Sequence, residues 1–187
     1  MDVLASFLDG PRAQGAFLLR SMFDPPWSLR IQDEAPLTVL SMVRGDAWIG
    51  FDDGAPRALG PGDVAVIRGP EPYTVSDTSD RPPRVVIHPG QECTTVDGES
   101  LATTMDLGVR TWGNSPDGAV VMLTGTYLTD GEVSRRLLDT LPPLTVLAAE
   151  TTRIPVVELL ADEVAKDDPG QTAVLDRLLD PAATRTA

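Results

Sequence analysis

The 187-residue chain has very little of the two side chains that most often bind transition metals: one cysteine, Cys93, and one histidine, His88. A single cysteine cannot form a disulfide within the chain, which agrees with a reducing compartment. One histidine and one cysteine do not supply the ligands of a zinc site of the His/Cys type. The counts leave a carboxylate site for Mg²⁺ or Ca²⁺ open, but the sequence holds no calcium-loop pattern. We therefore expect no metal and no cofactor.

Basic residues are also scarce, because 15 Lys and Arg stand against 28 Asp and Glu and give a net charge of −13. Nucleic-acid binding depends on a basic face, so this chain by itself is not predicted to bind DNA. The sequence contains no apolar run of the roughly 20 residues that cross a bilayer. Its start, "MDVLASFLDG", lacks the basic segment of a signal peptide. We expect a cytoplasmic protein without a membrane partner.

Glycine and proline, in contrast, are plentiful, with 16 and 17 residues. Between residues 15 and 130, short apolar runs such as "LTVLSMV", "AWIGF" and "DVAVI" alternate with turn clusters such as "RGD", "DDGAP" and "RGPEP". This spacing is typical of an antiparallel β-sandwich or β-barrel. The polar segment 90–118 is expected to be a long loop with one weak strand at most. The run "AVVMLTGTYL" predicts the final buried strand.

Helical patterns flank this region. Residues 1–14 begin with a short amphipathic pattern and are predicted to form an N-terminal helix. Residues 131–187 are predicted to form a helical part, with a pair of helices in "IPVVELLADEVAK" and "DDPGQTAVLDRLLD". The predicted fold is therefore mostly β: a barrel over 15–130, a short N-terminal helix and a C-terminal helical pair.

The stretch "GPGDVAVIRGPEPY", residues 60–73, resembles the second sequence motif of cupin barrels, G-x5-P-x-G-x2-H-x3-N. Gly62 opens the motif and Asp63 to Ile67 form its strand. Tyr73 stands at the histidine position and Asp77 at the asparagine position. The first cupin motif would end at Gly45, with Thr38 at its glutamate position and Asp33 and Ile31 at its two histidine positions. The resemblance implies a jelly-roll barrel whose metal site has been lost.

A longer resemblance covers about 160 residues. The pieces "FLLRSMFDPPWSLRI", "LSMVRGDAWIGFDDGAPRALGPGDVAVI" and "VVMLTGTYLTDGEVSRRLLDTLPPLTVL", followed by "VLDRLLD", are similar in order to the N-terminal domain of AraC-type transcriptional regulators. In that family a cupin-like barrel senses a small-molecule effector, the following helices contribute to a homodimer, and helix-turn-helix units bind DNA. The resemblance implies either a sensor domain whose DNA-binding part lies beyond Ala187, or a natural relative that consists of the sensor domain alone.

Side-chain alternation predicts which residues line such a barrel. If the positions of the lost metal ligands point inward, an apolar pocket with the hydroxyls of Thr38 and Tyr73 results, suited to an uncharged or aromatic ligand. The predicted ligand-binding residues are Trp27, Leu29, Ile31, Thr38, Leu40, Met42, Tyr73 and Val75. The apolar stripe of the C-terminal helices is predicted to be core against the barrel, with a part shared in a dimer. The predicted dimerisation residues are Val157, Leu160, Val164, Leu175 and Leu178.

Three interpretations stay open at this stage. The first is an effector-sensing domain without catalysis, and we expect no enzyme activity. The second is a small cupin enzyme of the isomerase or dioxygenase type, against which stand the missing histidines and the absence of a paired acid and base. The third is an interaction module whose side chains fill the barrel completely. His88, Cys93 and Trp48 are expected to be a rim residue, an inert thiol and a core aromatic, respectively.

Overall fold

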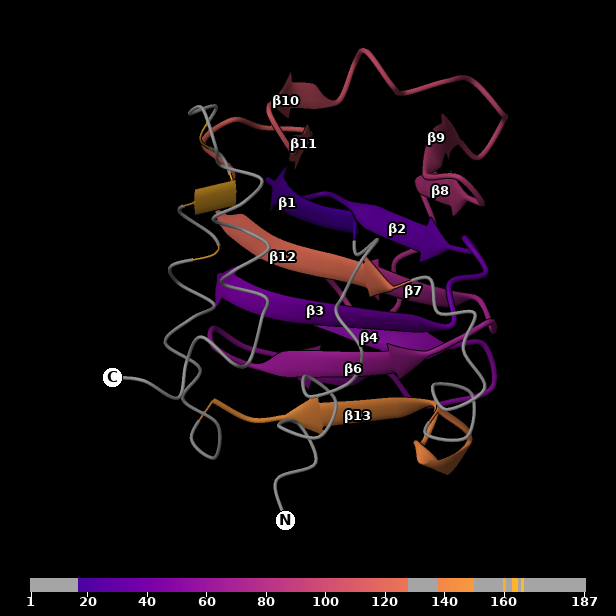
Figure 1. The fold of residues 1–187 in the computed structure, drawn as a ribbon. Coiled ribbons are helices and arrows are strands. Elements are labelled where there is room, and N and C mark those ends of the chain that lie inside the picture. Colours follow the sequence, from indigo (N-terminus) through magenta and orange to yellow (C-terminus); the bar gives the residue numbers. More distant parts are fainter. Residues whose placement is uncertain (1–16, 128–137, 150–159, 161–162, 165, 167–187) are drawn as a thin grey trace.

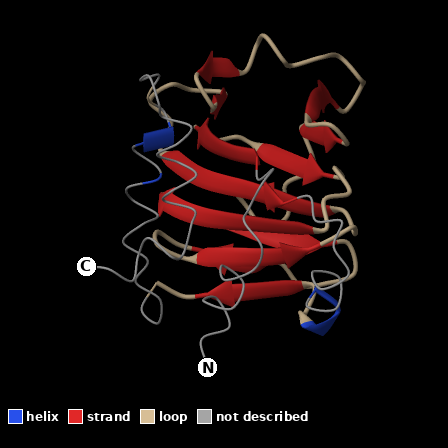
Figure 2. Ribbon diagram, in the orientation of Figure 1, coloured by secondary structure: helices blue, strands red, loops and turns tan. Residues whose placement is uncertain are grey.

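Short strands make up most of the structure, a computed structural model that describes residues 17–127, 138–149, 160, 163–164 and 166. Figure 2 shows how strongly strands predominate over helix in these residues. The prediction of a mostly β fold is therefore confirmed. The predicted N-terminal helix and most of the predicted C-terminal helical pair lie outside the described residues. The strands are β1 (Phe17–Phe23), β2 (Ser28–Ile31), β3 (Leu37–Arg44), β4 (Ala47–Phe51), β5 (Arg57–Leu59), β6 (Val64–Arg68), β7 (Tyr73–Ser76), β8 (Val85–His88), β9 (Glu92–Thr95), β10 (Asp106–Gly108), β11 (Thr111–Gly113), β12 (Val120–Tyr127) and β13 (Leu144–Leu147).

The strands form two sheets that face each other. One sheet has seven strands in the order β10-β11-β1-β12-β3-β6-β13, and the other has six in the order β5-β4-β7-β2-β8-β9. Figure 1 shows the long strands β12, β3 and β6 side by side, with β4 and β7 behind them. The expected antiparallel pairing holds for most neighbours, but β1–β11 and β2–β8 pair in parallel. Both exceptions join strands that are far apart in sequence, so no hairpin constrains their direction.

Strand alternation places the core between the sheets. Along β4, Ala47 and Ile49 are buried while Trp48 between them is only half-buried. The same alternation runs through the other sheet, where Leu40 and Met42 on β3 face inward. Side chains of both sheets therefore pack into one cluster, as in a jelly-roll sandwich.

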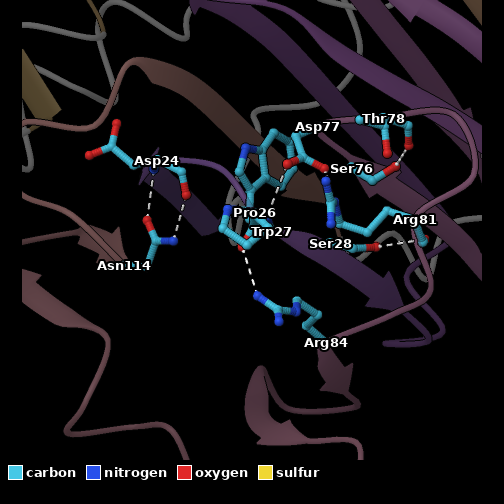
Figure 3. Close-up of polar contacts among 10 residues, drawn as sticks. All are labelled: Asp24, Pro26, Trp27, Ser28, Ser76, Asp77, Thr78, Arg81, Arg84 and Asn114. Carbon is cyan, nitrogen blue, oxygen red and sulfur yellow. Dashed lines mark hydrogen bonds and ion pairs between the residues drawn. The ribbon is translucent and has the colours of Figure 1, made fainter.

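Aromatic side chains fill one end of this core. Phe23 is fully buried, and its ring lies 4.9 Å from Trp27 in a stacked arrangement and 5.6 Å from Trp112 in an edge-on one. Polar contacts around the adjoining segment close this end (Figure 3). The backbone N–H and C=O of Asp24 exchange hydrogen bonds of 2.8 Å with the Asn114 amide.

The Asp77 carboxylate, just after β7 of the six-stranded sheet, makes further polar contacts at this end of the barrel. It accepts a hydrogen bond from the backbone N–H of Trp27 at 3.3 Å and forms an ion pair with Arg81 (Figure 3). Asp77 is also the residue at the asparagine position of the cupin motif. Its side chain therefore holds the Trp27 segment against the end of β7.

Two segments differ from the sequence-based expectation. The segment 90–118 contains three short strands, β9, β10 and β11, where we expected a loop with one weak strand. Residues 144–147, expected within the helical part, form β13 and pair with β6. Both misses have the same cause, because strands of three or four residues carry too few alternating positions to show a period.

Gly62 illustrates how the chain turns between these strands. Its φ of +86° favours glycine, and a Cβ at this position would lie 2.8 Å from the Cβ of Ala149. The motif glycine therefore permits both the turn into β6 and the close approach of the residues after β13.

The outer face of the seven-stranded sheet carries a second, smaller apolar cluster. Leu160 and Val164 are buried there against Leu18 and Leu123, with Val43 at the margin. These two predicted dimerisation residues therefore contact their own barrel. Val157, Leu175 and Leu178 lie outside the described residues.

Removing Phe23 from the aromatic end of the core should destabilise the domain strongly. We expect Phe23→Ala to lower the free energy of unfolding by about 3–5 kcal/mol, because it leaves a cavity between two tryptophans. Urea denaturation followed by circular dichroism measures this loss. Val96→Ala is the control, since Val96 is 59% exposed, and it should change stability by no more than about 0.5 kcal/mol. A Phe23→Ala loss no larger than that of the control would contradict the packing described here.

Candidate functional site

The four positions that match the cupin metal ligands come together at the end of the barrel away from Phe23. Ile31 pairs with Tyr73 across β2 and β7, and Thr38 pairs with Thr126 across β3 and β12. Tyr73 and Thr38 lie on opposite sheets, and the Thr38 side chain is close enough to the Tyr73 hydroxyl to lower its pKa. Asp33, just after β2, lines the same space. The four positions that the motif alignment identifies therefore lie near one another, although none of them is a histidine.

A small cavity lies between the sheets at this end. The volume that the centre of a water-sized sphere can occupy inside this cavity is about 50 Å³. A single water needs about 10–15 Å³ of such space, so the cavity holds only a few waters as it stands. Its lining is mostly apolar with a few polar groups, which is typical of a small-molecule site. The lining residues are Leu19, Ser21, Leu29, Ile31, Asp33, Leu40, Tyr73, Val75, Ile87, Gln91, Trp112, Met122, Thr124 and Thr126.

Five of the eight predicted ligand-binding residues line this cavity: Leu29, Ile31, Leu40, Tyr73 and Val75. The other three are buried beside it. Thr38 contacts Tyr73, while Trp27 stacks on Phe23 and Met42 belongs to the same buried core cluster. That any of the eight binds a ligand stays a prediction.

The polar groups of the cavity differ in their charge. Burial raises the pKa of the Tyr73 hydroxyl well above its ordinary value, the hydrogen bond with Thr38 lowers it in part, and the negative charge of Asp33 raises it further. Tyr73 is therefore a neutral hydrogen-bonding group at physiological pH. The Asp33 carboxylate accepts hydrogen bonds from the backbone N–H of Ala35 at 3.2 Å and from Nε2 of Gln91 at 3.0 Å. The arrangement can recognise a ligand by hydrogen bonds inside an otherwise apolar space.

The sequence matches a protein-family model described as Cupin over residues 2–184. The chain belongs to the cupin family. The match confirms the kinship with cupin domains of AraC-type regulators that the sequence motifs predicted. No curated protein matches this cupin in sequence.

Solved structures of ToxT from Vibrio cholerae are similar to this cupin at low identity. The apo form of a ToxT variant aligns with 93% of this chain and 56% of its own, at 7% identity and a TM-score of 0.49. ToxT with a bound unsaturated fatty acid aligns with 89% of this chain and 50% of its own, at 8% identity and a TM-score of 0.41. This cupin spans about half the length of those chains.

Sequence reasoning missed the part of the lining that other strands contribute. Ser21 on β1 and Met122, Thr124 and Thr126 on β12 follow the same alternation as the predicted residues. A period of two along both strands, combined with their pairing, would have found them. Trp112 and Gln91 come from the segment expected to be a loop, and no sequence pattern places them at the barrel interior.

A shallow groove of about 240 Å³ lies on the outer face of the six-stranded sheet. Trp48 lines it together with Thr74 and Ser76. The expectation that Trp48 is a core aromatic is therefore wrong, because Ala47 and Ile49 take the inward positions of β4. At the groove's margin, Arg30 and Asp52 form a bidentate ion pair. Nη1 of Arg30 lies 2.6 Å from Oδ1 of Asp52, and Nη2 lies 2.7 Å from Oδ2. Asp52 is largely exposed, so this pair contributes little to stability.

Neither the single histidine nor the single cysteine is among the lining residues of the cavity. His88 bridges neighbouring strands, with Nδ1 3.3 Å from the Gln32 amide and Nε2 3.0 Å from the Thr94 hydroxyl. Cys93 lies on β9, and burial together with the charge of Glu92 raises the pKa of its thiol, which disfavours the reactive thiolate. Among the described residues, no three His, Cys, Asp or Glu side chains gather where they could hold a metal ion. The helical residues that the structure describes form no segment long and apolar enough to span a bilayer.

The raised pKa of Tyr73 makes a specific prediction for alkaline pH. Because the folded state disfavours the phenolate, the stability that Tyr73 contributes is fully present below its unfolded pKa of about 10 and is lost as pH rises above it. Each pH unit above that value should cost up to about 1.4 kcal/mol per such tyrosine. We expect the stability of Tyr73→Phe, measured by urea denaturation, to fall less steeply with pH than that of the unmodified chain.

Tyr127 provides the comparison. It is the second of the two tyrosines in the chain, and burial raises its pKa as well. The double variant Tyr73→Phe, Tyr127→Phe should therefore show the shallowest alkaline fall. If Tyr73→Phe follows the same pH curve as the unmodified chain, the buried phenol described here is not present in solution.

Proposed function

We propose that this cupin is the effector-sensing and dimerising domain of an AraC-type transcriptional regulator, and that a small molecule binds in the barrel without a metal. The observation that carries the proposal is the cavity itself. It lies between the two sheets, its lining includes Ile31, Asp33 and Tyr73, which the motif alignment matches to cupin metal ligands, and its few polar groups border an apolar space. Such a site suits a small ligand held by a few hydrogen bonds. As a regulator, the protein would act in the cytoplasm.

We further propose that the site binds its ligand without catalysing a reaction. General acid–base catalysis works best with groups whose pKa lies near the operating pH. Tyr73 is held neutral by burial, and both oxygens of Asp33 already accept hydrogen bonds. The alternative of an isomerase or dioxygenase would be revived if the purified protein carried iron, manganese or zinc.

The strands that line the cavity also contact the C-terminal segment, of which the structure describes residues 160, 163, 164 and 166. Leu19 and Met122 face the cavity from β1 and β12, while Leu18 and Leu123 on the same strands contact Leu160 and Val164 on the outer face. An effector that shifts these strands would therefore change the surface under the C-terminal segment. For this to regulate, the effector must bind two arrangements of the protein with different affinity.

Effector binding and its location can be tested together. A small-molecule screen by thermal shift should find compounds that stabilise the domain. For such a compound, Tyr73→Phe and Thr38→Val should each weaken binding by about 3- to 10-fold, because each removes one neutral hydrogen bond. Thr145→Val is the matched control, since Thr145 lies on β13 away from the cavity lining. Unchanged affinity in both cavity variants would refute the site assignment.

The regulator and its dimer are tested on the product of the native reading frame. We expect the frame to continue past Ala187 for roughly 100 residues that carry two helix-turn-helix patterns and a basic face. In sedimentation equilibrium we expect a homodimer, and Leu178→Asp should shift it toward the monomer because a charge in an apolar interface is costly. A frame that stops at Ala187, or a protein that stays monomeric, would contradict this part of the proposal.

A further inference from the structure

The charge of the cavity lining points to a particular class of ligand. Asp33 is the one acidic residue among the described lining residues, and none of them is lysine, arginine or histidine. The remaining polar groups are hydroxyls and the Gln91 amide. A ligand that enters this space therefore meets one negative charge and no described positive one.

Asp33 already binds a hydrogen-bond donor from another part of the chain. Gln91 follows Gly90 in the turn between β8 and β9, and its Nε2 donates to Oδ2 of Asp33 at 3.0 Å. The backbone of Gln91 has a φ of +64°, a region that side-chain-bearing residues other than Asn, Asp and His rarely occupy. The turn thus holds a strained residue whose side chain ends on the cavity carboxylate.

We propose that Asp33 selects effectors that carry a primary ammonium group on an apolar body, and that this group takes the place of the Gln91 amide on Oδ2. The inference rests on the proposed function, since it assumes that the barrel cavity is the effector site. The apolar part of the ligand packs against Leu29, Leu40 and Trp112. In the protein without ligand, the Gln91 amide then occupies the hydrogen-bonding position on Asp33 that the ligand's ammonium group would take.

The negative charge of Asp33 explains why a cationic ligand should bind more tightly than a neutral or an anionic one. An ammonium group on Asp33 forms a charge-assisted hydrogen bond, which is stronger than the neutral amide contact that it replaces. A carboxylate ligand would bring a second negative charge into the same partly buried space, with no described cation to offset it. A neutral alcohol can donate to Asp33 without the gain from opposite charge. The expected order of affinity is therefore amine, alcohol, hydrocarbon and carboxylate.

Four probes with one apolar body test this order: benzylamine, benzyl alcohol, toluene and benzoate. Binding to the 187-residue chain is followed by two-dimensional ¹H–¹⁵N NMR, in which the three tryptophan indoles report location. Trp112 lines the cavity and Trp48 lies in the outer groove. We expect benzylamine to shift the Trp112 indole signal but not the Trp48 signal, and to bind about 10- to 100-fold more tightly than toluene.

Two cavity variants and one control separate selection by Asp33 from general binding. Asp33→Asn should abolish the preference for benzylamine while leaving toluene affinity unchanged. Gln91→Asn is too short to reach Asp33 but tolerates a positive φ, and it should raise benzylamine affinity several-fold by removing the internal competitor. Asp97→Asn, in an exposed turn, removes the same charge elsewhere and should change none of the affinities.

The outcomes distinguish this inference from the function on which it rests. If the probes shift Trp112 but benzoate binds as well as benzylamine, or if Asp33→Asn keeps the amine preference, the ligand class is wrong and the effector site stands. If no probe shifts Trp112, including toluene, the barrel is solid and both proposals fail. Benzylamine selectivity that is lost in Asp33→Asn and kept in Asp97→Asn supports the inference.

Discussion

The register of β12 with its two neighbours is the constraint on which the rest of the structure depends. This strand pairs residue by residue with β1 on one side, and on the other side it pairs with β3, where the register shifts once between Val121 and Met122. The pairing sends Met122, Thr124 and Thr126 into the barrel and Leu123 to the outer face. A slip of one residue would exchange the two sets, bury different side chains and remove the hydroxyls from the cavity. The register of β12 therefore determines three things together: which side chains form the core, which line the cavity, and which contact Leu160 and Val164 on the outer face.

Along the barrel, the stacked aromatic residues and the polar groups of the cavity lie toward opposite ends. The end around Phe23, Trp27 and Met42 is aromatic or aliphatic and closely packed, with polar contacts that tie its loops together. The end around Thr38 and Tyr73 buries hydroxyl groups, which stabilise less than a well-packed apolar core because each must find a hydrogen-bond partner. The packed end makes this loss tolerable, since a binding site needs a rigid support more than it needs stability of its own.

Much of this arrangement could be predicted from the sequence, because its cause is local. The apolar alternation of "LTVLSMV" and "DVAVI" identified strands with inward faces. The alignment of the first cupin motif, which ends at Gly45, identified Ile31, Asp33 and Thr38, and the alignment of the second, which starts at Gly62, identified Tyr73. What could not be predicted depends on pairing between distant segments. Trp112 and Gln91 reach the interior because β11 joins β1 in parallel and the β8–β9 turn lies beside Asp33. Trp48 was misplaced for a similar reason: an aromatic residue in a strand is as compatible with the outer face as with the core, and only register decides.

The positions that the motif alignment matches to cupin metal ligands lie together in space but carry side chains of different chemistry. A cupin metal site needs side chains from both sheets that point at one spot, and this chain keeps that convergence with Ile31, Asp33, Thr38 and Tyr73. Three of the four substitutions leave groups that are neutral at physiological pH, so Asp33 alone gives the spot a charge. In a metal-binding cupin such a charge would be balanced by the cation. Here the balancing partner within the described chain is a neutral amide, that of Gln91, held by a backbone in an unfavourable region. A carboxylate whose hydrogen-bond partners are all neutral favours a cationic ligand, because the ligand gains more from the carboxylate than the protein loses by releasing its own donor.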